Sequence, residues 1–199
     1  MKEFIIATNN KKKLTEIKRI LAPLGIVPVT AADKGIDLGD VEETGTTFAE
    51  NAYIKAKAAF DICGLPVIAD DSGLCVDALD GRPGIYSARY GGHESPYSVK
   101  INMLLDEMKD VAENDRSAHF SCAVCCILRS GEVIAVEGRC YGKIAHEPSG
   151  DGGFGYDPIF TVDGKSFASL SDEEKDRLSH RGNALRMLYN KLRERKEEL

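Results

Sequence analysis

Two adjacent acidic residues, Asp70 and Asp71, stand where a short apolar run stops. Residues 67–69 have the apolar character of a strand interior, and the apolar pattern resumes at residues 74–76. We therefore expect both carboxylates in a tight turn between two buried segments. Neighbouring carboxylates repel each other unless a cation or a proton lies between them, which favours a metal site or a general base. The alternative to a metal site or a general base is an ordinary turn, because Asp and Ser are common turn formers.

A second acidic pair, Glu42 and Glu43, lies in the loop before a predicted helix that carries Lys55. Carboxylate oxygens suit Mg²⁺, which typically takes one or two carboxylates and leaves its other positions to water and substrate phosphate. Acidic loop residues can also be ordinary solubilising charge, and the metal interpretation requires this loop to meet Asp70 and Asp71 in space. A Mg²⁺ site that joins the two acidic segments is therefore a hypothesis.

The polar segment at residues 8–13 follows the first predicted strand and begins the first predicted helix. It consists of Thr8, Asn9, Asn10, Lys11, Lys12 and Lys13. Free backbone N–H groups, the positive end of the helix dipole and the lysines would converge there, a combination that binds phosphate. The three lysines could instead form a solvated face, and the glycine spacing of a P-loop is absent from the segment.

An aromatic loop and a cationic pair occur in the last quarter of the chain. Residues 154–157 have the sequence Phe-Gly-Tyr-Asp, which suits stacking of a base and hydrogen bonding to its edge. A corner between a loop and a strand is the alternative interpretation. His180 and Arg181 interrupt a helical region, and a lone pair of this kind usually lies at the surface.

Hydrophobic periodicity predicts alternating strands and helices that would position these residues. Capping boxes, Thr47 with Glu50 and Ser171 with Glu174, mark the starts of two helices. The predicted strands lie at residues 4–7, 67–69, 118–128 and 133–144. The predicted helices include residues 14–21, 47–63 and 96–109. A last amphipathic helix would place Leu185, Leu188 and Leu192 inward. The last two strands flank Ser130-Gly131 like a hairpin. This order indicates an α/β fold around a mixed central β-sheet flanked by helices.

The composition is that of a soluble globular protein, and we expect one folding unit over residues 1–199. No apolar run approaches the ~20 residues that span a bilayer, and the first apolar stretch is shorter than a secretory signal requires. We therefore expect a cytoplasmic location and no membrane partner. The net charge of −6 disfavours a broad basic face for nucleic acid, so an anionic substrate would need locally clustered cations.

All six cysteines are embedded in apolar sequence, which favours reduced, buried thiols over disulfides. Cys122 and Cys125 form a C-x-x-C pattern, but no second pair accompanies it and the segment has strand-like composition. We interpret these residues as core filler.

Six segments follow one another along the chain in a recognisable order. They are TNNKKK at 8–13, EETGTTFAENA at 42–52, IADDSGL at 68–74, PGIYSARY at 83–90, GGFGYDPIF at 152–160 and SHRGNAL at 179–185. Together they closely resemble the inosine triphosphate pyrophosphatases, which act on deaminated purine nucleotides. The resemblance runs from residue 1 to about residue 195 without a large gap, and the ordered set is far more specific than any one segment.

The resemblance implies a role for each of these segments. Residues 8–13 and Lys55 would hold the triphosphate, Glu42 and Asp71 would ligate Mg²⁺, and Asp71 would also be the general base. Asp70 would support the turn. The residues implied in further contacts with the substrate are Ser72, Phe154, Gly155, Tyr156, Asp157, Lys175, His180 and Arg181. The resemblance also implies two lobes with a cleft between them and a homodimer.

The expected reaction is hydrolysis of dITP, ITP or XTP at the α-phosphorus, which gives the monophosphate and pyrophosphate. Two alternatives stay open at this point. A related pyrophosphatase would prefer modified pyrimidine or standard nucleotides, and a regulatory module would bind a nucleotide without turnover. The second alternative needs neither Asp71 nor Mg²⁺, so the presence of both Glu42 and Asp71 counts against it.

Overall fold

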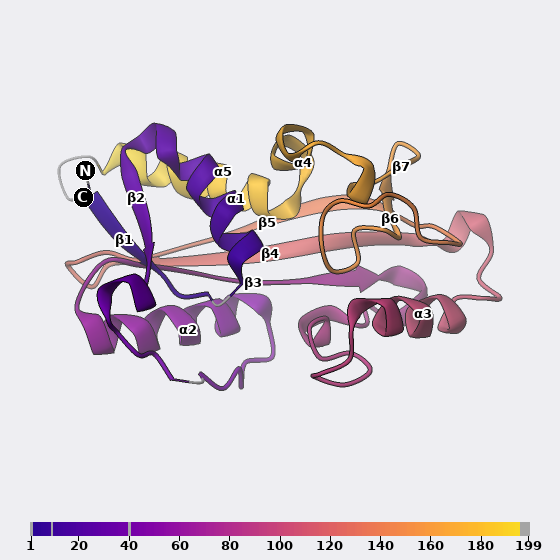
Figure 1. Cartoon of the computed structure of the whole chain (residues 1–199), viewed down its shortest axis with the longest axis horizontal. Coiled ribbons are helices and arrows are strands. Elements are labelled where there is room, and N and C mark those ends of the chain that lie inside the picture. The colour runs from indigo at the N-terminus through magenta and orange to yellow at the C-terminus, as the bar shows by residue number, and fades with distance from the viewer. Residues whose placement is uncertain (1, 9, 40, 196–199) are drawn as a thin grey trace. The chain divides into compact units, whose positions relative to one another are not determined.

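The computed structural model of the chain describes residues 2–8, 10–39 and 41–195 (Figure 1). Its strands are β1 (Lys2–Ile6), β2 (Ile26–Thr30), β3 (Val67–Val76), β4 (Ser117–Ile127), β5 (Val133–Ile144), β6 (Phe160–Val162) and β7 (Lys165–Ser166). Its α-helices are α1 (Lys11–Leu21), α2 (Phe48–Cys63), α3 (Tyr97–Glu107), α4 (Asp172–Leu178) and α5 (His180–Glu194). Short 3₁₀ turns occupy several of the connections.

The seven strands form one sheet in the order β2-β1-β3-β4-β5-β6-β7. β1 pairs in parallel with both β2 and β3, whereas β6 pairs antiparallel with both β5 and β7. The sheet is therefore mixed, and the predicted α/β fold with a mixed central sheet is confirmed.

The chain divides into two compact units. Unit 1 comprises Met1–Asp71, Cys122–Gly138 and His180–Leu199, and unit 2 comprises Ser72–Ser121 and Arg139–Ser179. The strands β3, β4 and β5 each contribute residues to both units. The single folding unit and the cleft between two lobes stay predictions.

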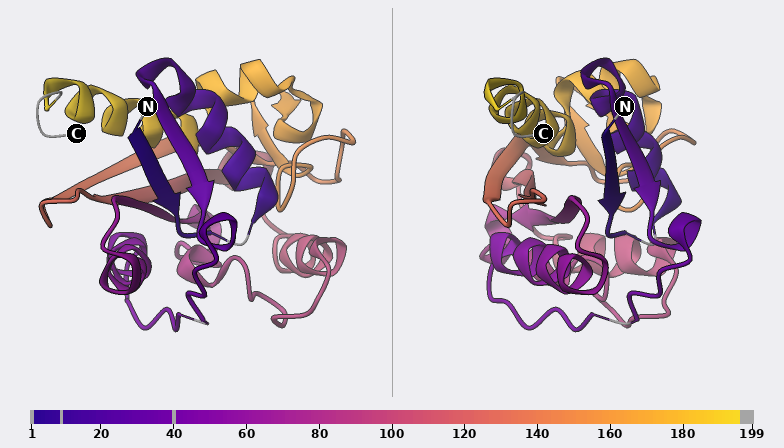
Figure 2. Two further views of the ribbon diagram at one scale, coloured as in Figure 1. Left: turned by 60° about the vertical axis from the view of Figure 1, so that its left-hand side comes forward. Right: turned by 90° about the vertical axis from the view of Figure 1, so that its left-hand side faces the viewer.

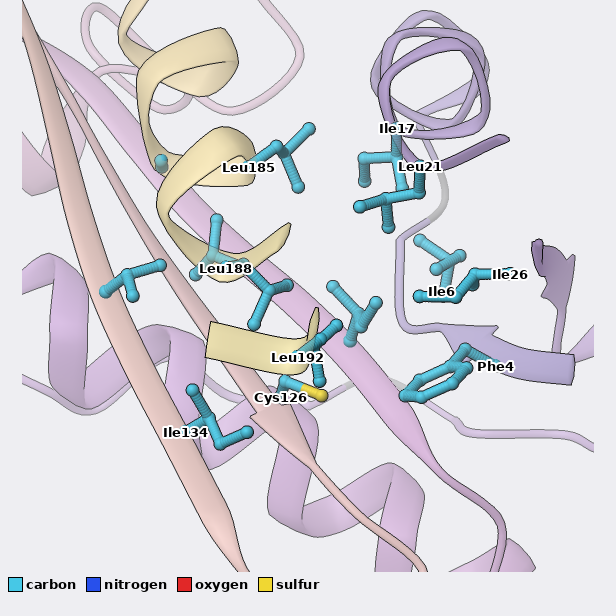
Figure 3. Packing of buried hydrophobic residues seen from close by; sticks show 14 of the residues in the cluster. Phe4, Ile6, Ile17, Leu21, Ile26, Cys126, Ile134, Leu185, Leu188 and Leu192 are labelled. Carbon is cyan, nitrogen blue, oxygen red and sulfur yellow. The ribbon is translucent and has the colours of Figure 1, made fainter. Parts of the chain in front are cut away.

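Unit 1 has helices on both faces of its strands because successive side chains of a strand point to opposite sides. Ile6 of β1 and Ile68 of β3 pack with α1 and α5, which lie side by side on one face (Figure 1 and Figure 2). Ile5 and Val67 point the other way and pack with α2. Figure 3 shows the first of these clusters, in which Leu185, Leu188 and Leu192 are buried as predicted.

Unit 2 packs α3 against its own strand segments. Ile101 and Leu104 of α3 are buried in one cluster with Phe120 and Phe160. The rings of Phe120 and Phe160 lie 4.7 Å apart between centroids in an edge-to-face arrangement, which adds to the stabilisation that burial of aromatic area supplies.

Local signals place both ends of α2 and the start of α4 where we predict them. The Thr47 hydroxyl accepts from the Glu50 backbone, the Glu50 side chain accepts from the Thr47 backbone, and the helix ends at Gly64 in a left-handed conformation. The same reciprocal box joins Ser171 and Glu174 at the start of α4.

The predicted turn at the aspartate pair is wrong, because β3 runs without interruption from Val67 to Val76 through Asp70 and Asp71. Charged residues can occupy a buried strand when each meets partners from neighbouring elements, and those partners come from distant parts of the chain. The pair is thus part of the sheet itself.

Four of the six cysteines are buried, and within the described residues none forms a disulfide bond. Burial raises the pKa of Cys122 to about 12 and that of Cys125 to about 11. Thiols of this kind stay protonated and unreactive at neutral pH, as expected for core filler.

Candidate active site

The carboxyl ends of the parallel strands in unit 1 form a topological switch point. The chain leaves β1 for α1 on one face of the sheet and leaves β2 for α2 on the other face. Crevices at such points are common ligand sites in α/β sheets. A pocket of about 400 Å³ lies at the carboxyl ends of β1 and β2, and its lining includes Ile6, Thr8, Thr30, Ile36 and Asp37 but no residue of β3.

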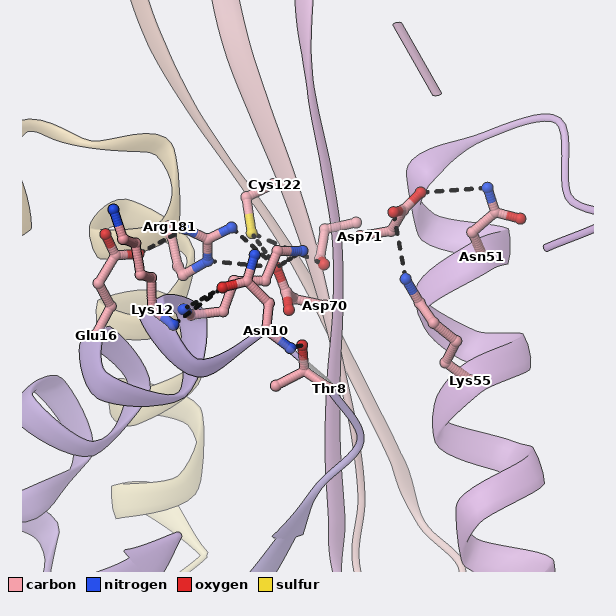
Figure 4. Close-up of polar contacts among 12 residues, drawn as sticks. Thr8, Asn10, Lys12, Glu16, Asn51, Lys55, Asp70, Asp71, Cys122 and Arg181 are labelled. Atoms are coloured by element: carbon pink, nitrogen blue, oxygen red, sulfur yellow. Dashed lines mark hydrogen bonds and ion pairs between the residues drawn. The ribbon is translucent and has the colours of Figure 1, made fainter. Parts of the chain in front are cut away.

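The two aspartates of β3 face opposite sides of the sheet (Figure 4). Asp70 follows Ile68 in the alternation and so points toward α1 and α5. Asp71 follows Ala69 and points toward α2. The repulsion expected between neighbouring carboxylates is relieved by this geometry, with each carboxylate in its own environment.

Asp70 lies in a buried group of charges that balance one another. Its Oδ2 is 2.9 Å from Lys13 Nζ and accepts from Nε and Nη2 of Arg181 at 3.3 and 3.2 Å. The remaining Arg181 nitrogen, Nη1, donates to Glu16 at 2.5 Å. Burial opposes ionisation of Asp70, but Lys13 and Arg181 outweigh it and hold its pKa well below the usual range.

Asp71 lies among fewer positive charges. Its Oδ2 accepts from Asn51 Nδ2 at 3.2 Å, and its Oδ1 is 3.3 Å from Lys55 Nζ, which also donates to Glu43 at 2.6 Å. Burial raises the pKa of Asp71, Lys55 opposes this shift and Glu43 adds to it. Burial lowers the pKa of Lys55, but the carboxylates of Asp71, Asp70 and Glu43 outweigh this effect and raise the pKa overall.

The start of α1 differs from the predicted phosphate site in one respect. The amides of Lys12 and Lys13 donate to Asn10 Oδ1 at 3.0 and 3.2 Å, and the Asn10 amide donates to Thr8 Oγ1 at 3.2 Å. These amides are therefore capped by the chain's own side chains instead of free. Lys11 and Lys12 are exposed, and Asn9 lies outside the described residues.

The acidic loop before α2 contributes Glu43 to the surroundings of Asp71 through Lys55, whereas Glu42 is exposed. Among the described residues, no group of three or more His, Cys, Asp or Glu side chains is arranged to hold a metal. Mg²⁺ needs only one or two carboxylates, and the acidic oxygens of Asp71 and Glu43 already converge on one cation, Lys55 Nζ. The chemistry of this donor set fits Mg²⁺.

In unit 2 the aromatic loop is held by a buried carboxylate. Asp157 Oδ2 accepts from the Phe154 amide and from Lys175 Nζ, both at 2.7 Å. The Lys175 ammonium lies 4.3 Å from the centroid of the Phe154 ring, within range of a cation–π contact. Gly153 is in a left-handed conformation, and a Cβ there would lie 2.2 Å from Asp157 Oδ2.

Tyr156, one of the two aromatic residues of this loop, belongs to the core of unit 2. The residue is 2% exposed, its hydroxyl donates to the Ser87 carbonyl at 3.1 Å, and its ring meets that of Tyr97 edge to face. A buried tyrosine of this kind satisfies its polar end locally. Phe154 is half-buried and Ser72, on β3, is half-buried in the same unit.

His180 and Arg181 are buried, which contradicts the expectation that a lone pair of this kind lies at the surface. They open α5 directly after the break at Ser179, as the interrupted helical pattern predicts. The Arg181 guanidinium is 2% exposed and bonded to Asp70 and Glu16. Its burial is possible because both partners are anionic.

Two residues near the aspartates are not found by our sequence analysis. Asn51 is fully buried and Glu16 is 7% exposed, and both contact charged groups of the site. The sequence signal that points to Asn51 is its helical spacing. Asn51 and Lys55 are four residues apart on α2, next to the inward alanines Ala52 and Ala56, where a polar side chain needs a partner.

No helix among the described residues is both long and apolar enough to cross a membrane.

Comparison with known proteins identifies the family of the chain. A model described as the Ham1 family matches residues 4–191. The dITP/XTP pyrophosphatase of Streptomyces coelicolor is 46% identical over 98% of this chain and 98% of its own length. That of Escherichia coli is 46% identical over 97% and 99%, respectively. A structure of a HAM1 protein from Coxiella burnetii has a TM-score of 0.88 and 39% identity over 98% of this chain and 100% of that one. The chain belongs to the Ham1 family.

Proposed function

We propose that this chain is a Mg²⁺-dependent pyrophosphatase that converts dITP, ITP and XTP to their monophosphates and pyrophosphate. The hydrolase activity on deaminated purine nucleotides follows from the family and from the dITP/XTP pyrophosphatases that match nearly the whole chain. The observation that supports the residue assignment is the uneven charge on β3. Asp70 is neutralised by Lys13 and Arg181, whereas Asp71 keeps a raised pKa.

We assign Asp71 as the general base. In the reaction, a water oxygen forms a bond to the α-phosphorus, the bond from that phosphorus to the bridging oxygen of the leaving pyrophosphate breaks, and the water proton passes to the Asp71 carboxylate. A carboxylate whose pKa lies above its ordinary value is a better proton acceptor than an ordinary aspartate. The bonds from Asn51 and Lys55 orient its two oxygens.

Pyrophosphatases of this family are generally metal-dependent, and we propose Mg²⁺ as the ion. Asp71 and Glu42 would hold it, and Glu43 of the same loop contacts Lys55, which also contacts Asp71. When bound, the ion would neutralise charge on the leaving pyrophosphate. Lys55, Lys11, Lys12 and Lys13 would contribute positive charge of the same kind from the protein. Lys13 would do so while it stays paired with Asp70.

Selection of the base would depend on hydrogen-bond donors. Hypoxanthine and xanthine carry a 6-oxo acceptor, whereas adenine carries a 6-amino donor, so donors from His180, Arg181 or the backbone would be unmatched with ATP. An unsatisfied buried donor costs about 1 to 3 kcal/mol. We assign Phe154, Gly155, Asp157 and Lys175 of unit 2 to the base and ribose, with Ser72 as a further contact. Tyr156 would act by supporting that loop.

A homodimer, a cytoplasmic location and the absence of a nucleic-acid partner belong to the same proposal. The net charge of −6 supports the last of these.

The test is a steady-state comparison of ITP, XTP, dITP, GTP and ATP with Mg²⁺, in which pyrophosphate and orthophosphate are measured separately. We expect pyrophosphate from the first three substrates, slow turnover of ATP, and no turnover in EDTA. Release of orthophosphate, or equal rates in EDTA, would overturn the proposal. Faster turnover of pyrimidine nucleotides would favour the related pyrophosphatase, and nucleotide binding without any product would favour the regulatory module.

A further inference from the structure

We infer that Asn51 is a positioning residue that holds the Asp71 carboxylate and the acidic loop at residues 41–46 in one arrangement. The inference rests on the proposed function, because it concerns the carboxylate that we assign to the attacking water. All of the groups that carry it lie in unit 1.

The Asn51 amide is satisfied at both ends inside the protein. The side chain is fully buried, its Oδ1 accepts from the Gly45 amide at 2.8 Å, and its Nδ2 donates to Asp71 Oδ2 at 3.2 Å. The acceptor bond at Gly45 determines which end of the amide is oxygen, so the nitrogen must face Asp71. Buried polar groups that are satisfied at both ends define one geometry.

Gly45 supplies an independent observation for the same contact. A Cβ at this position would lie 2.6 Å from Asn51 Oδ1 and 2.7 Å from Glu50 Cβ. Real Cβ atoms essentially never come so close to another heavy atom, so the loop backbone reaches the Asn51 amide only because residue 45 is glycine. Gly45 and Asn51 are thus both suited to the hydrogen bond between them.

Lys55 forms a second connection between the same parts. It lies one helical turn after Asn51 on α2 and contacts Glu43 of the loop at 2.6 Å and Asp71 Oδ1 at 3.3 Å. Helix α2 therefore links loop to strand twice, once through a neutral amide and once through an ammonium. The amide holds Asp71 Oδ2 without adding positive charge beside it, and with both oxygens held the carboxylate cannot rotate freely.

The decisive variant is Asn51→Asp, which preserves the side-chain size and the acceptor for Gly45 but replaces the donor to Asp71 with an acidic oxygen. We expect kcat for dITP with Mg²⁺ to fall by about 10- to 100-fold, the usual effect of losing a hydrogen-bond partner of a reactive or metal-binding group, with a much smaller change in KM. Amide exchange of residues 41–46, measured in the metal-free protein, should stay at the wild-type rate.

Asn51→Ala removes both bonds, so we expect the same fall in kcat and also an exchange rate at residues 41–46 that is about fivefold higher. Gly45→Ala disrupts the same contact from the loop side and should lower kcat without altering Asn51. This variant tests the inference if Asn51→Asp does not fold. The matched control is Lys57→Gln on the same helix, because the exposed Lys57 ammonium pairs with Asp61 of α2 itself. It should leave kcat and exchange unchanged.

Wild-type kcat in both Asn51→Asp and Gly45→Ala would overturn the inference, as would unchanged exchange in Asn51→Ala. These failures are distinct from failure of the proposed function, in which the wild-type protein itself releases no pyrophosphate from dITP. Even then, the exchange measurement in metal-free protein would still decide whether Asn51 holds the loop.

Discussion

Asp70 and Asp71 are neighbouring, chemically identical residues, but the two faces of β3 shift their pKa values in opposite directions. On the face toward α1 and α5, Asp70 is matched by Lys13 and Arg181 and its pKa is lowered. On the face toward α2, Asp71 has one ammonium that it shares with Glu43, and its pKa is raised. The difference shows that the surrounding charges, more than burial, decide the direction in which each pKa shifts, since both residues are buried.

The largest expected effect comes from breaking the balanced face with Arg181→Met. The substitution removes the 2.5 Å contact of Arg181 with Glu16 and the two hydrogen bonds from Arg181 to Asp70, which keeps its contact with Lys13. Removal of one member of a buried ion pair typically costs about 3 to 5 kcal/mol. Urea denaturation should show this loss in the free energy of unfolding. The partly exposed pair of Arg195 and Glu132 is the control, and Arg195→Met should cost about 1 kcal/mol or less.

The next effect concerns the other face. Asp71→Asn should lower kcat about 100-fold, which corresponds to about 2.7 kcal/mol of transition-state stabilisation. Its free energy of unfolding should stay close to that of the wild-type protein, because burial disfavours the charge at this position and Lys55 keeps Glu43 as a partner. Steady-state kinetics and urea denaturation measure the two quantities. Near-normal turnover would remove Asp71 from the mechanism.

The pH dependence of stability tests the lowered pKa of Asp70 directly. The pKa of Asp70 is lowered on folding, so its charge stabilises the folded state at pH values above the unfolded pKa of about 3.8. That contribution is lost as the pH falls below this value toward the folded pKa. The stability advantage of the wild-type protein over Asp70→Asn should therefore shrink by about 1.4 kcal/mol per pH unit below pH 3.8. Denaturant unfolding between pH 2.5 and 6 measures it, and a constant difference would contradict the assignment.

The smallest effect is at the start of α1. Asn10→Ala removes the acceptor for the amides of Lys12 and Lys13, which should cost about 1 kcal/mol of stability. Asn10→Asp keeps the acceptor and should retain the stability. Thermal denaturation of the two variants makes the comparison, and an equal loss in both would show that the cap is unimportant.

Local structure was largely predictable because its causes are local. The capping box of Thr47 and Glu50, the stop at Gly64 and the inward leucines of α5 all depend on residues a few positions apart. The interruption between α4 and α5 at Ser179 was visible for the same reason. The assignment of Asp70 and Asp71 to a turn failed because the end of an apolar run resembles the end of a strand when the partners of the charges are unknown.

The residues around the aspartates were only partly predictable. Lys55 and Asp71 were expected at one site and do meet. Asn51 was missed because its helical spacing beside the inward alanines indicates burial but does not identify the partner of the amide. The capped amides at Asn10 were missed because the same residue type caps helices and binds ligands.

The sequence by itself determined the family resemblance, the order of the longer helices with the strands β1, β3, β4 and β5, and the presence of two acidic segments with lysines near them. Tertiary structure alone decided which carboxylate is neutralised. Arg181 reaches Asp70 across 111 positions of the chain, and the alternation of a continuous strand turns Asp71 to the other face. Local preferences act over a few residues, whereas the electrostatic state of a buried group depends on whatever packing brings within a few ångströms of it.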